Sequence, residues 1–555
     1  MKYLELVRVY EDLERTSGRL DKVNILSKLL KKSGKELKDV VYLIQGRVFS
    51  RLDERKLGMS SRLILKVMSH VVGIKIDEVE KEWRKKGDLG NVVEELLKRK
   101  RQKTLGFKEL TVEKVVNNIR KLSELEGKGT VNKKVQLVSE LLNNAQPEEG
   151  KFIVRTVLED LRIGVAEGVL RDAIAKAFDV DVKDVEKTHN VLVDYGEIAE
   201  KAKEKKLDKI DVSVGKPIKV MLAILVKDVE EGFKSVGKPA LFEFKYDGFR
   251  LCVHKKGNEI KLFTRRMEDV SKQFPDIVKV VKEHVEGSSC IIDCEAVGID
   301  ENGRYLPFQK ISQRIKRKYD IDGMSKRFPV ELNVFDVLYY NGKSLMNEEL
   351  KERRKILKKI IKEKKKKIVL TESLETDNEK KALEFYKKAV SEGLEGVMIK
   401  NLKSNYKPGR YVNGWVKLKH VLEPLDLVIV GAEYGTGKRG GLLSSFDLAC
   451  RKDDKFLKIG KVGTGIKEKT EGVTFRDLTK ELKPCILEIK GKKVKVKPKV
   501  VVEVIYEEIQ KSVNYESGYA LRFPRLVRIR DDKRIDDVNT LSEVENIFGK
   551  QRGGK

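Results

Sequence analysis

The spacing of apolar residues changes twice along this chain, and these changes limit the folds that it can adopt. Up to about residue 210, segments such as VNILSKLLKKS and EKVVNNIRKLSEL place apolar residues three and four positions apart, as in amphipathic helices. From there, short β-branched runs alternate with helical segments, and from about residue 423 short strands and turns dominate. A chain of 555 residues is also too long for one hydrophobic core.

We therefore predict a multidomain protein with three parts of different class. Residues 1–212 should form an all-α domain, residues 213–422 an α+β domain, and residues 423–555 a small β-barrel domain. The segment VLEDLRIGVAEGVLRDAIAKAF predicts one or two helices that join near Gly164. The basic run between residues 351 and 367 is typical of a solvated helix face, and we assign it no specific role.

The charge balance points to a polyanionic partner. Lys and Arg outnumber Asp and Glu by 118 to 88, for a formal net charge of +30, and they are not confined to a terminal tail. A surface charged for solubility or heat tolerance would give a similar composition, and both interpretations can hold together. The five cysteines show no zinc-binding spacing, so we expect ordinary buried thiols. With no signal peptide and no membrane-length apolar run, we expect a soluble, intracellular, cytoplasmic protein.

The segment FEFKYDGFRL, residues 242–251, is the sharpest chemical signal. A strand lysine, Lys245, is followed by an Asp-Gly turn and by Arg250. Taken alone, this could be any β-hairpin, since Asp-Gly is a common turn. The functional interpretation is that Lys245, as a free amine, attacks the α-phosphate of a nucleotide.

Several later segments supply the other groups that nucleotidyl transfer needs. Glu295 and Phe335 lie on predicted strands, Glu395 precedes another, and Lys417 and Lys419 share one face of a strand. Each alone has an ordinary structural explanation, such as a paired carboxylate, a core aromatic or a solvated lysine. Together they offer a nucleophile, two carboxylates for Mg²⁺, an aromatic ring for a base and cations for phosphates.

This set of motifs resembles the covalent nucleotidyltransferase superfamily of ATP-dependent DNA ligases, RNA ligases and mRNA capping enzymes. KYDGFR is similar to the KxDGxR motif that carries the nucleophile of that superfamily. LRFPRLVRIRDDK, residues 521–533, resembles the last motif of DNA ligases of the archaeal and eukaryotic replicative type. PFQKISQR (307–314) and RTVLEDLRIGVAEGVLRDA (155–173) match the same subgroup, and the second lies in a helical region that capping enzymes lack.

The resemblance implies a role for each matching residue. Lys245 would form the lysyl-AMP intermediate, and Glu295 and Glu395 would hold Mg²⁺ or contact the ribose. The residues implied in nucleotide binding are Glu243 at the adenine amino group, Arg250 at the AMP phosphate and later at the 5′-phosphate of the nick, Arg265 at the AMP phosphate or ribose, Glu295, Phe335 stacked on adenine, Lys417 and Lys419 at the ATP phosphates, and Arg528, Arg530 and Lys533 at the departing pyrophosphate.

The implied architecture is a helical DNA-binding domain, an adenylation domain and an OB-fold, closing around duplex DNA. The implied function is ATP- and Mg²⁺-dependent sealing of nicks in replication, repair and recombination. The partner would be nicked duplex DNA, a sliding clamp is a further candidate partner, and we expect a monomer with no membrane contact. Whether ADP or NAD⁺ also serves, and which metal is preferred, stays open from the sequence.

Two other functions compete with this interpretation. An RNA ligase or capping-type enzyme fits poorly with the long helical region and the RFPRLVRIRDDK segment. A non-catalytic nucleic-acid-binding protein fits poorly with the intact lysine and carboxylates. The missing cysteine cluster argues against the NAD⁺-dependent bacterial type. One departure is PGRYVNGW, where Tyr411 replaces an arginine of the common PGKRxxxW pattern, so a nucleic-acid contact there stays open.

Overall fold

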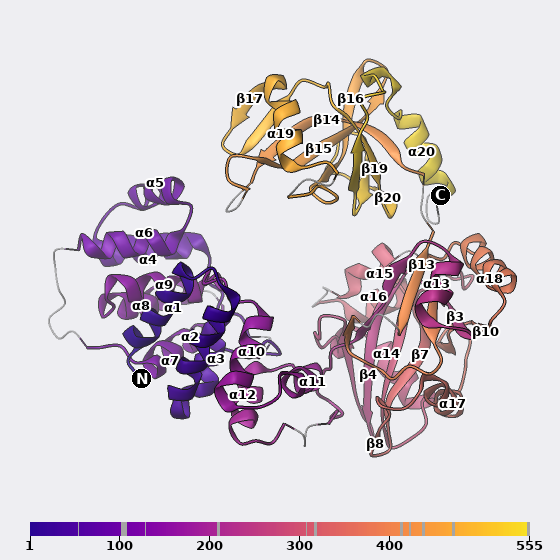
Figure 1. The fold of residues 1–555 in the computed structure, drawn as a ribbon, viewed down its shortest axis with the longest axis horizontal. Helices are drawn as coiled ribbons and strands as arrows, with labels where there is room; N and C mark the ends of the chain where they lie inside the picture. The colour runs from indigo at the N-terminus through magenta and orange to yellow at the C-terminus, as the bar shows by residue number, and fades with distance from the viewer. Residues whose placement is uncertain are drawn as a thin grey trace.

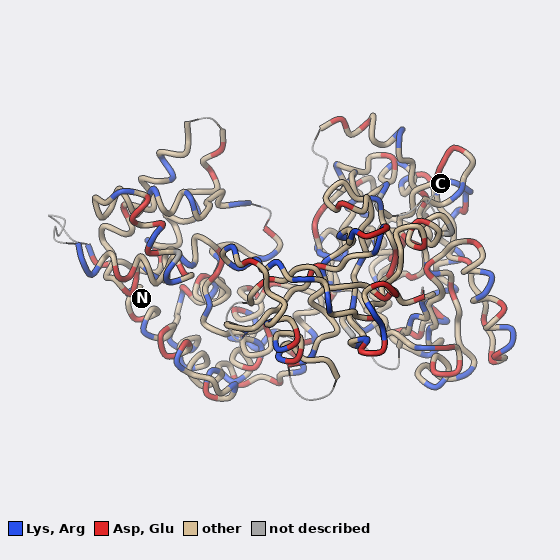
Figure 2. The backbone as a smooth tube through the Cα atoms, turned by 90° about the horizontal axis from the view of Figure 1, so that it is seen from above, with Lys and Arg blue, Asp and Glu red and all other residues tan. Residues whose placement is uncertain are grey.

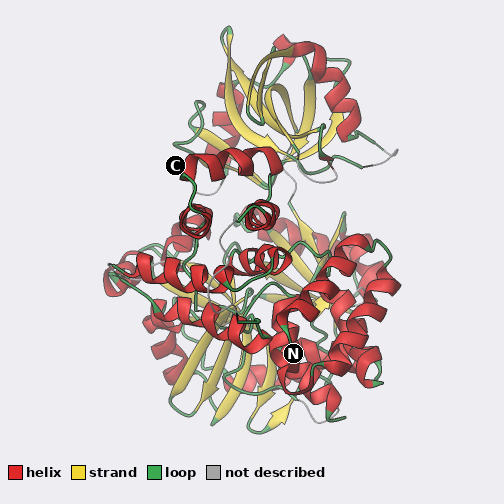
Figure 3. Ribbon diagram, turned by 90° about the vertical axis from the view of Figure 1, so that its left-hand side faces the viewer, coloured by secondary structure: helices red, strands yellow, loops and turns green. Residues whose placement is uncertain are grey.

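The protein consists of a helical part followed by two parts built on sheets (Figure 1). A computed structural model describes residues 1–551 except residues 54, 101–107, 128, 208–210, 307, 316–318, 411–413, 421–422, 436–438 and 469–471. Figure 3 shows the same division, with strands concentrated in two of the three parts. Figure 2 shows basic residues along the whole described chain, which agrees with a positive charge that is not confined to one end.

The N-terminal part packs its helices around one large apolar cluster. In the first helix the buried residues Tyr3, Leu6, Val7, Tyr10 and Leu13 follow the helical spacing. The segment around Gly164 forms two helices, as one of the two predicted arrangements had it. The helices are α1 (Tyr3–Arg15), α2 (Arg19–Lys32), α3 (Leu37–Ile44), α4 (Ser61–Val72), α5 (Ile76–Lys86), α6 (Leu89–Lys98), α7 (Val112–Lys121), α8 (Thr130–Asn143), α9 (Pro147–Val157), α10 (Glu167–Phe178), α11 (Val182–Leu192) and α12 (Tyr195–Lys203).

The central part holds two main sheets. One has the strand order β10-β3-β11-β13-β2, the other β5-β4-β6-β7-β8 with β9 beside β7, and β1 pairs with β12. The strands are β1 (Met221–Leu222), β2 (Ile224–Val226), β3 (Ala240–Lys245), β4 (Phe249–Lys256), β5 (Glu259–Thr264), β6 (Ser289–Gly298), β7 (Val330–Tyr340), β8 (Lys343–Ser344), β9 (Ile368–Leu370), β10 (Ser373–Thr376), β11 (Gly396–Asn401), β12 (Gly409–Arg410) and β13 (Trp415–Lys419). The helices are α13 (Val229–Val236), α14 (Pro275–His284), α15 (Phe308–Ile315), α16 (Ile321–Arg327), α17 (Leu350–Ile360) and α18 (Glu379–Ser391).

The C-terminal part is built on a seven-stranded sheet. Its path is β16-β15-β14-β18-β17, β19 pairs with β14 and β22, and β20 pairs with β21 in a separate hairpin. Its elements are β14 (Leu425–Tyr434), β15 (Leu443–Lys452), β16 (Lys455–Val462), α19 (Phe475–Leu482), β17 (Ile486–Lys490), β18 (Lys493–Val496), β19 (Val501–Ile505), β20 (Glu508–Lys511), β21 (Tyr519–Arg522), β22 (Arg525–Ile529) and α20 (Leu541–Lys550). All five cysteines are buried free thiols, as predicted. No helix in the described ranges is long and apolar enough to cross a membrane.

Candidate nucleotide-binding site

Lys245 lies at the end of β3 in a cavity of about 1620 Å³, whose lining comes from all three parts of the chain. The Asp247–Gly248 turn after it connects two sheets, because β3 and β4 belong to different sheets and are not paired with each other in the described structure. The turn is therefore not the β-hairpin that the dipeptide alone would suggest. A side chain on Gly248 would collide with the backbone oxygen of Ala296, so the turn packs directly against β6.

A chain of alternating charges surrounds the Lys245 ammonium. Its Nζ lies 2.6 Å from Glu395 Oε2, and Lys419 Nζ lies 3.2 Å from the same oxygen. Lys419 also donates a 2.8 Å hydrogen bond to Glu507 of the C-terminal part. Burial acts to raise the pKa of Glu395, but Lys245 and Lys419 outweigh it and lower that pKa to about 2, so Glu395 stays ionised. Burial lowers the pKa of Lys417, and the neighbouring lysines add to this effect.

Two further carboxyl groups lie close to this chain of charges. Burial raises the pKa of Glu295 to about 8, although Lys245 and Arg250 act in the opposite direction. Burial, helped by Glu395, raises the pKa of Asp247 to about 6. Crowded oxygen donors of this kind suit a hard divalent cation such as Mg²⁺. Within the described ranges, no group of three or more His, Cys, Asp or Glu residues could hold a metal alone, so phosphate and water oxygens would complete the coordination.

Glu243 and Phe335 define another side of the cavity. Glu243 is 1% exposed and forms ion pairs with Lys400 and, at 2.7 Å, with Arg354. The Lys400 ammonium lies 4.5 Å from the centre of the Phe335 ring. Trp415 meets the same ring edge-on at 6.0 Å. This side therefore combines an aromatic face with a buried hydrogen-bond acceptor, as recognition of a base requires.

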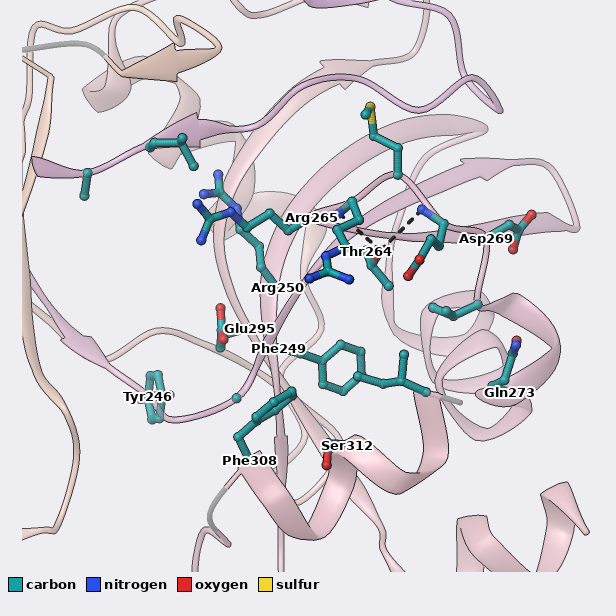
Figure 4. A pocket seen from close by; sticks show the side chains of 18 of the residues that line it. Tyr246, Phe249, Arg250, Thr264, Arg265, Asp269, Gln273, Glu295, Phe308 and Ser312 are labelled. Atoms are coloured by element: carbon teal, nitrogen blue, oxygen red, sulfur yellow. Dashed lines mark hydrogen bonds between the residues drawn. The ribbon is translucent and has the colours of Figure 1, made fainter. Parts of the chain in front are cut away.

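The two predicted phosphate-binding arginines also line the cavity. The Arg250 guanidinium is held by Asp293 at 2.8 Å, by the Met221 carbonyl at 2.6 Å and by the Tyr406 hydroxyl at 3.1 Å. Arg265 follows β5 and is exposed. Figure 4 shows Glu295 between Arg250 and Tyr246, with Phe249 to its right and Phe308 below it.

Arg528, Arg530 and Lys533 do not line the cavity. Arg528 forms an ion pair with Glu503 at 2.9 Å, and Arg530 and Lys533 form pairs with Asp426 at 2.9 and 2.7 Å. Arg530 lies just beyond β22 rather than within it. The C-terminal residues that do reach the cavity are Glu507, Arg522 and Phe523, at the ends of β20 and β21.

Models of known protein families match all three parts of the chain. The model of the ATP dependent DNA ligase domain matches residues 220–419, that of the DNA ligase N terminus residues 2–175, and that of the ATP dependent DNA ligase C terminal region residues 439–533. The chain belongs to the family of ATP-dependent DNA ligases.

Curated relatives agree over the whole length. A DNA ligase of Nanoarchaeum equitans is 47% identical, covering 100% of this chain and 99% of that protein. A DNA ligase of Thermococcus onnurineus is 42% identical, covering 99% of this chain and 98% of that protein. The solved structure "Pmar-Lig_PreS3" shares the fold with a TM-score of 0.59 at 20% identity, covering 95% of this chain and 99% of that chain. The multidomain, ligase-type fold predicted from the sequence is thus confirmed.

One sequence interpretation was wrong, and another lies outside the described residues. The basic run between residues 351 and 367 is not only a solvated face, because Arg353 and Arg354 on α17 are 0% and 7% exposed. Arg353 pairs with the buried Asp336 at 2.8 Å, and Arg354 reaches Glu243. Tyr411 belongs to the residues that the structure does not describe.

Sequence reasoning also missed partners that hold the site residues in place. Asp293 and Tyr406, which fix Arg250, carried no motif signal of their own. The first is one of several polar residues along β6, and the second lies between strands. Lys400 also received no role from the sequence, although it is fully buried beside Glu243. The only available signal for Lys400 was its place at the end of EGLEGVMIK, a segment that predicts a turn into a strand.

Proposed function

We propose that this chain seals nicks in duplex DNA with Lys245 as its covalent nucleophile. The observation that carries the proposal is the position of Lys245 at the end of β3, inside the cavity, where its ammonium shares Glu395 Oε2 with Lys419 of β13. A primary amine among phosphate-binding cations is what attack on a nucleotide requires. The function would serve replication, repair and recombination of DNA.

The reaction we propose has three displacements at phosphorus. The Lys245 amine first loses its proton and bonds to the α-phosphorus of ATP, and pyrophosphate leaves. The 5′-phosphate oxygen of a nick then attacks this phosphorus, and the P–N bond breaks. Finally the 3′-hydroxyl oxygen attacks the 5′-phosphorus, and AMP leaves. Lys417, Lys419, Arg250 and Arg265 would bind the phosphates or ribose throughout.

Glu295 and Glu395 would hold Mg²⁺, and phosphate and water oxygens would complete its coordination. When bound, the cation would offset the charge of the phosphates. Glu395 is already ionised at neutral pH, whereas Glu295, with a pKa of about 8, would have to lose a proton first. Glu395 would then exchange part of its ion pair with Lys245 for the cation.

We propose that the helical part binds the duplex and that the three parts are a DNA-binding domain, an adenylation domain and an OB-fold domain. In support, Arg47, Arg51, Arg55 and Lys56 of the helical part line the same cavity as Lys245. The proposed boundaries after residues 212 and 422 fall between α12 and β1 and between β13 and β14. Monomeric behaviour and a sliding-clamp partner remain predictions.

Labelling with α-³²P-ATP tests the nucleophile directly. Lys245→Ala should lose all protein labelling and all nick sealing, while exposed Lys256→Ala on β4 should keep both. Lys245→Arg should also be inactive, because a guanidinium stays protonated and cannot attack. Label retained on Lys245→Ala would refute the assignment. Parallel assays with ATP, ADP and NAD⁺, on nicked DNA and nicked RNA, separate a DNA ligase from an RNA ligase.

A further inference from the structure

The basic helix α17 has two neighbouring arginines that point into the protein. Arg353 serves the fold, since it binds the buried Asp336 and the backbone oxygens of Glu348 and Ser404. Arg354 points elsewhere and reaches the cavity side that holds Glu243 and Phe335. A buried arginine in a helix otherwise rich in exposed lysines calls for a specific explanation.

The Arg354 guanidinium connects three strands. Its Nη1 donates to Glu243 Oε1 on β3 at 2.7 Å and to the Phe335 carbonyl on β7 at 3.4 Å. Its Nη2 donates to Ser373 Oγ on β10 at 3.1 Å. Strands β3 and β7 belong to the two different sheets of the central part. One planar group thus fixes the acceptor and the aromatic residue of the base-binding side relative to each other.

Of the two cations that pair with Glu243, Arg354 keeps its positive charge more firmly than Lys400 does. Lys400 pairs with the other Glu243 oxygen, but burial lowers its pKa, whereas a guanidinium keeps its charge. A carboxylate whose two oxygens both pair with cations acts as a hydrogen-bond acceptor. It would therefore attract an amino group on a base and repel a carbonyl oxygen at the same position.

We propose that Arg354 is a positioning residue that sets the choice of nucleobase. By holding Glu243 as an oriented acceptor beside Phe335, it makes the site select a purine with an amino group at position 6 over one with a carbonyl there. This inference rests on the proposed function, since it requires the base of ATP to lie between Glu243 and Phe335. A site built to hydrogen-bond a specific group rejects an analogue that lacks it.

The test compares self-nucleotidylation by ATP and ITP, which differ at position 6 of the purine. In Arg354→Met, kcat/KM for ATP should fall by about tenfold or more, mainly through KM, while the value for ITP changes little. The ATP preference of the wild-type protein should therefore collapse. Arg354→Lys keeps the charge but cannot reach all three partners, so it should restore the preference only in part. Lys355→Ala, an exposed neighbour on α17, should leave both values unchanged.

Two outcomes would overturn the inference. One is an unchanged ATP/ITP ratio in Arg354→Met, and the other is an equal loss with both nucleotides through kcat, which a purely structural role would give. If Arg354→Met fails to fold, Ser373→Ala removes a single contact of the guanidinium and should shift the ratio in the same direction; no shift there overturns it as well. A wild-type protein that takes no label from ATP would instead refute the proposed function, so the two failures are distinguishable.

Discussion

The nucleotide-binding residues of the central part and the basic motif of the C-terminal part have opposite surroundings. In the centre, Lys245 and Glu243 lie on β3 and Arg250 lies on β4, and all three line one cavity. In the C-terminal part, Arg530 and Lys533 are paired with Asp426 of their own sheet. The first group therefore has its partners at the site of chemistry, and the second has them away from it.

Because of this difference, we infer that the residues around Lys245 and the pair Arg530 and Lys533 cannot contact the same nucleotide in the arrangement seen here. Contact with departing pyrophosphate would require Arg530 and Lys533 to exchange Asp426 for phosphate oxygens. It would also require the C-terminal part to turn its motif toward Lys245, where Glu507 and Arg522 now lie. We infer that this part swings onto the adenylation site for the first step and away again for DNA, a common form of gating.

The largest effect should come from the carboxylates, on which the pre-formed central site depends. Glu395→Ala and Glu295→Ala should each lower self-adenylation by about a thousandfold, as expected for loss of a preorganised charged group. EDTA should stop the wild-type protein, and added Mg²⁺ should restore it. Rates of lysyl-AMP formation at saturating ATP measure the effect. Wild-type rates in both variants would show that the metal assignment is wrong.

The pH dependence of the metal requirement separates the two carboxylates. Because the pKa of Glu295 is raised to about 8, this group holds a proton at neutral pH that a cation must displace. The Mg²⁺ concentration for half-maximal adenylation should therefore fall as the pH rises toward about 9. Glu295→Gln should flatten this dependence. Glu395 should not contribute to it, since its pKa of about 2 leaves it ionised throughout.

A loss of intermediate size is expected when Arg530 and Lys533 are replaced, and only in the formation of lysyl-AMP. Arg530→Ala combined with Lys533→Ala should slow lysyl-AMP formation by about a hundredfold. Sealing of a nick that already carries AMP should survive much better, since that substrate needs no pyrophosphate release. Lys452→Ala with Lys455→Ala removes the same charge from the exposed β15–β16 turn and should change neither step. Equal losses in both assays would mean that the motif serves folding or DNA binding, and the swinging motion should then be abandoned.

Periodicity predicted the elements of the fold but not their partners. The strand carrying Lys245 and the strand after it were both expected, yet they lie in different sheets, because pairing depends on distant segments such as β11 and β6. Short strands were expected from about residue 423, and there β18, β19 and β20 follow one another closely, with Pro498 in the gap between the first two. The local spacing of apolar residues predicts whether a segment forms a helix or a strand. The order of the strands in a sheet depends on contacts between segments that are far apart in the chain.

The sequence predicted those site residues that belong to short motifs. Lys245, Glu295, Lys417 and Lys419 lie on strands and Glu395 directly precedes one, as their motifs predicted, while their roles stay predictions. Arg354 was not found, because a run of like charges indicates solvent exposure. Its spacing of four residues from Leu350 and three from Leu357, both buried, was the available signal that it lies close to the apolar face of α17.

The smallest effect concerns the contact that holds the C-terminal part in its present place. Glu507 is half-exposed and accepts a 2.8 Å hydrogen bond from Lys419, which we assign to the ATP phosphates. Glu507→Gln should free Lys419 and favour the other arrangement, so lysyl-AMP formation should speed up, by at most about fivefold for a contact this exposed. The gain should shrink as salt rises, because the wild-type ion pair is itself screened.

A matched control makes this small effect interpretable. Glu516→Gln removes the same charge from an exposed position between β20 and β21 and should leave the adenylation rate unchanged. If Glu507→Gln adenylates more slowly than the wild type, then Glu507 holds Lys419 ready for ATP rather than blocking it. The C-terminal part would then act in the first step from the position it has here. In that case the C-terminal part would contribute to the chemistry through the hairpin β20–β21, and not through Arg530 and Lys533. No movement of this part would then be needed to explain the difference between the two regions.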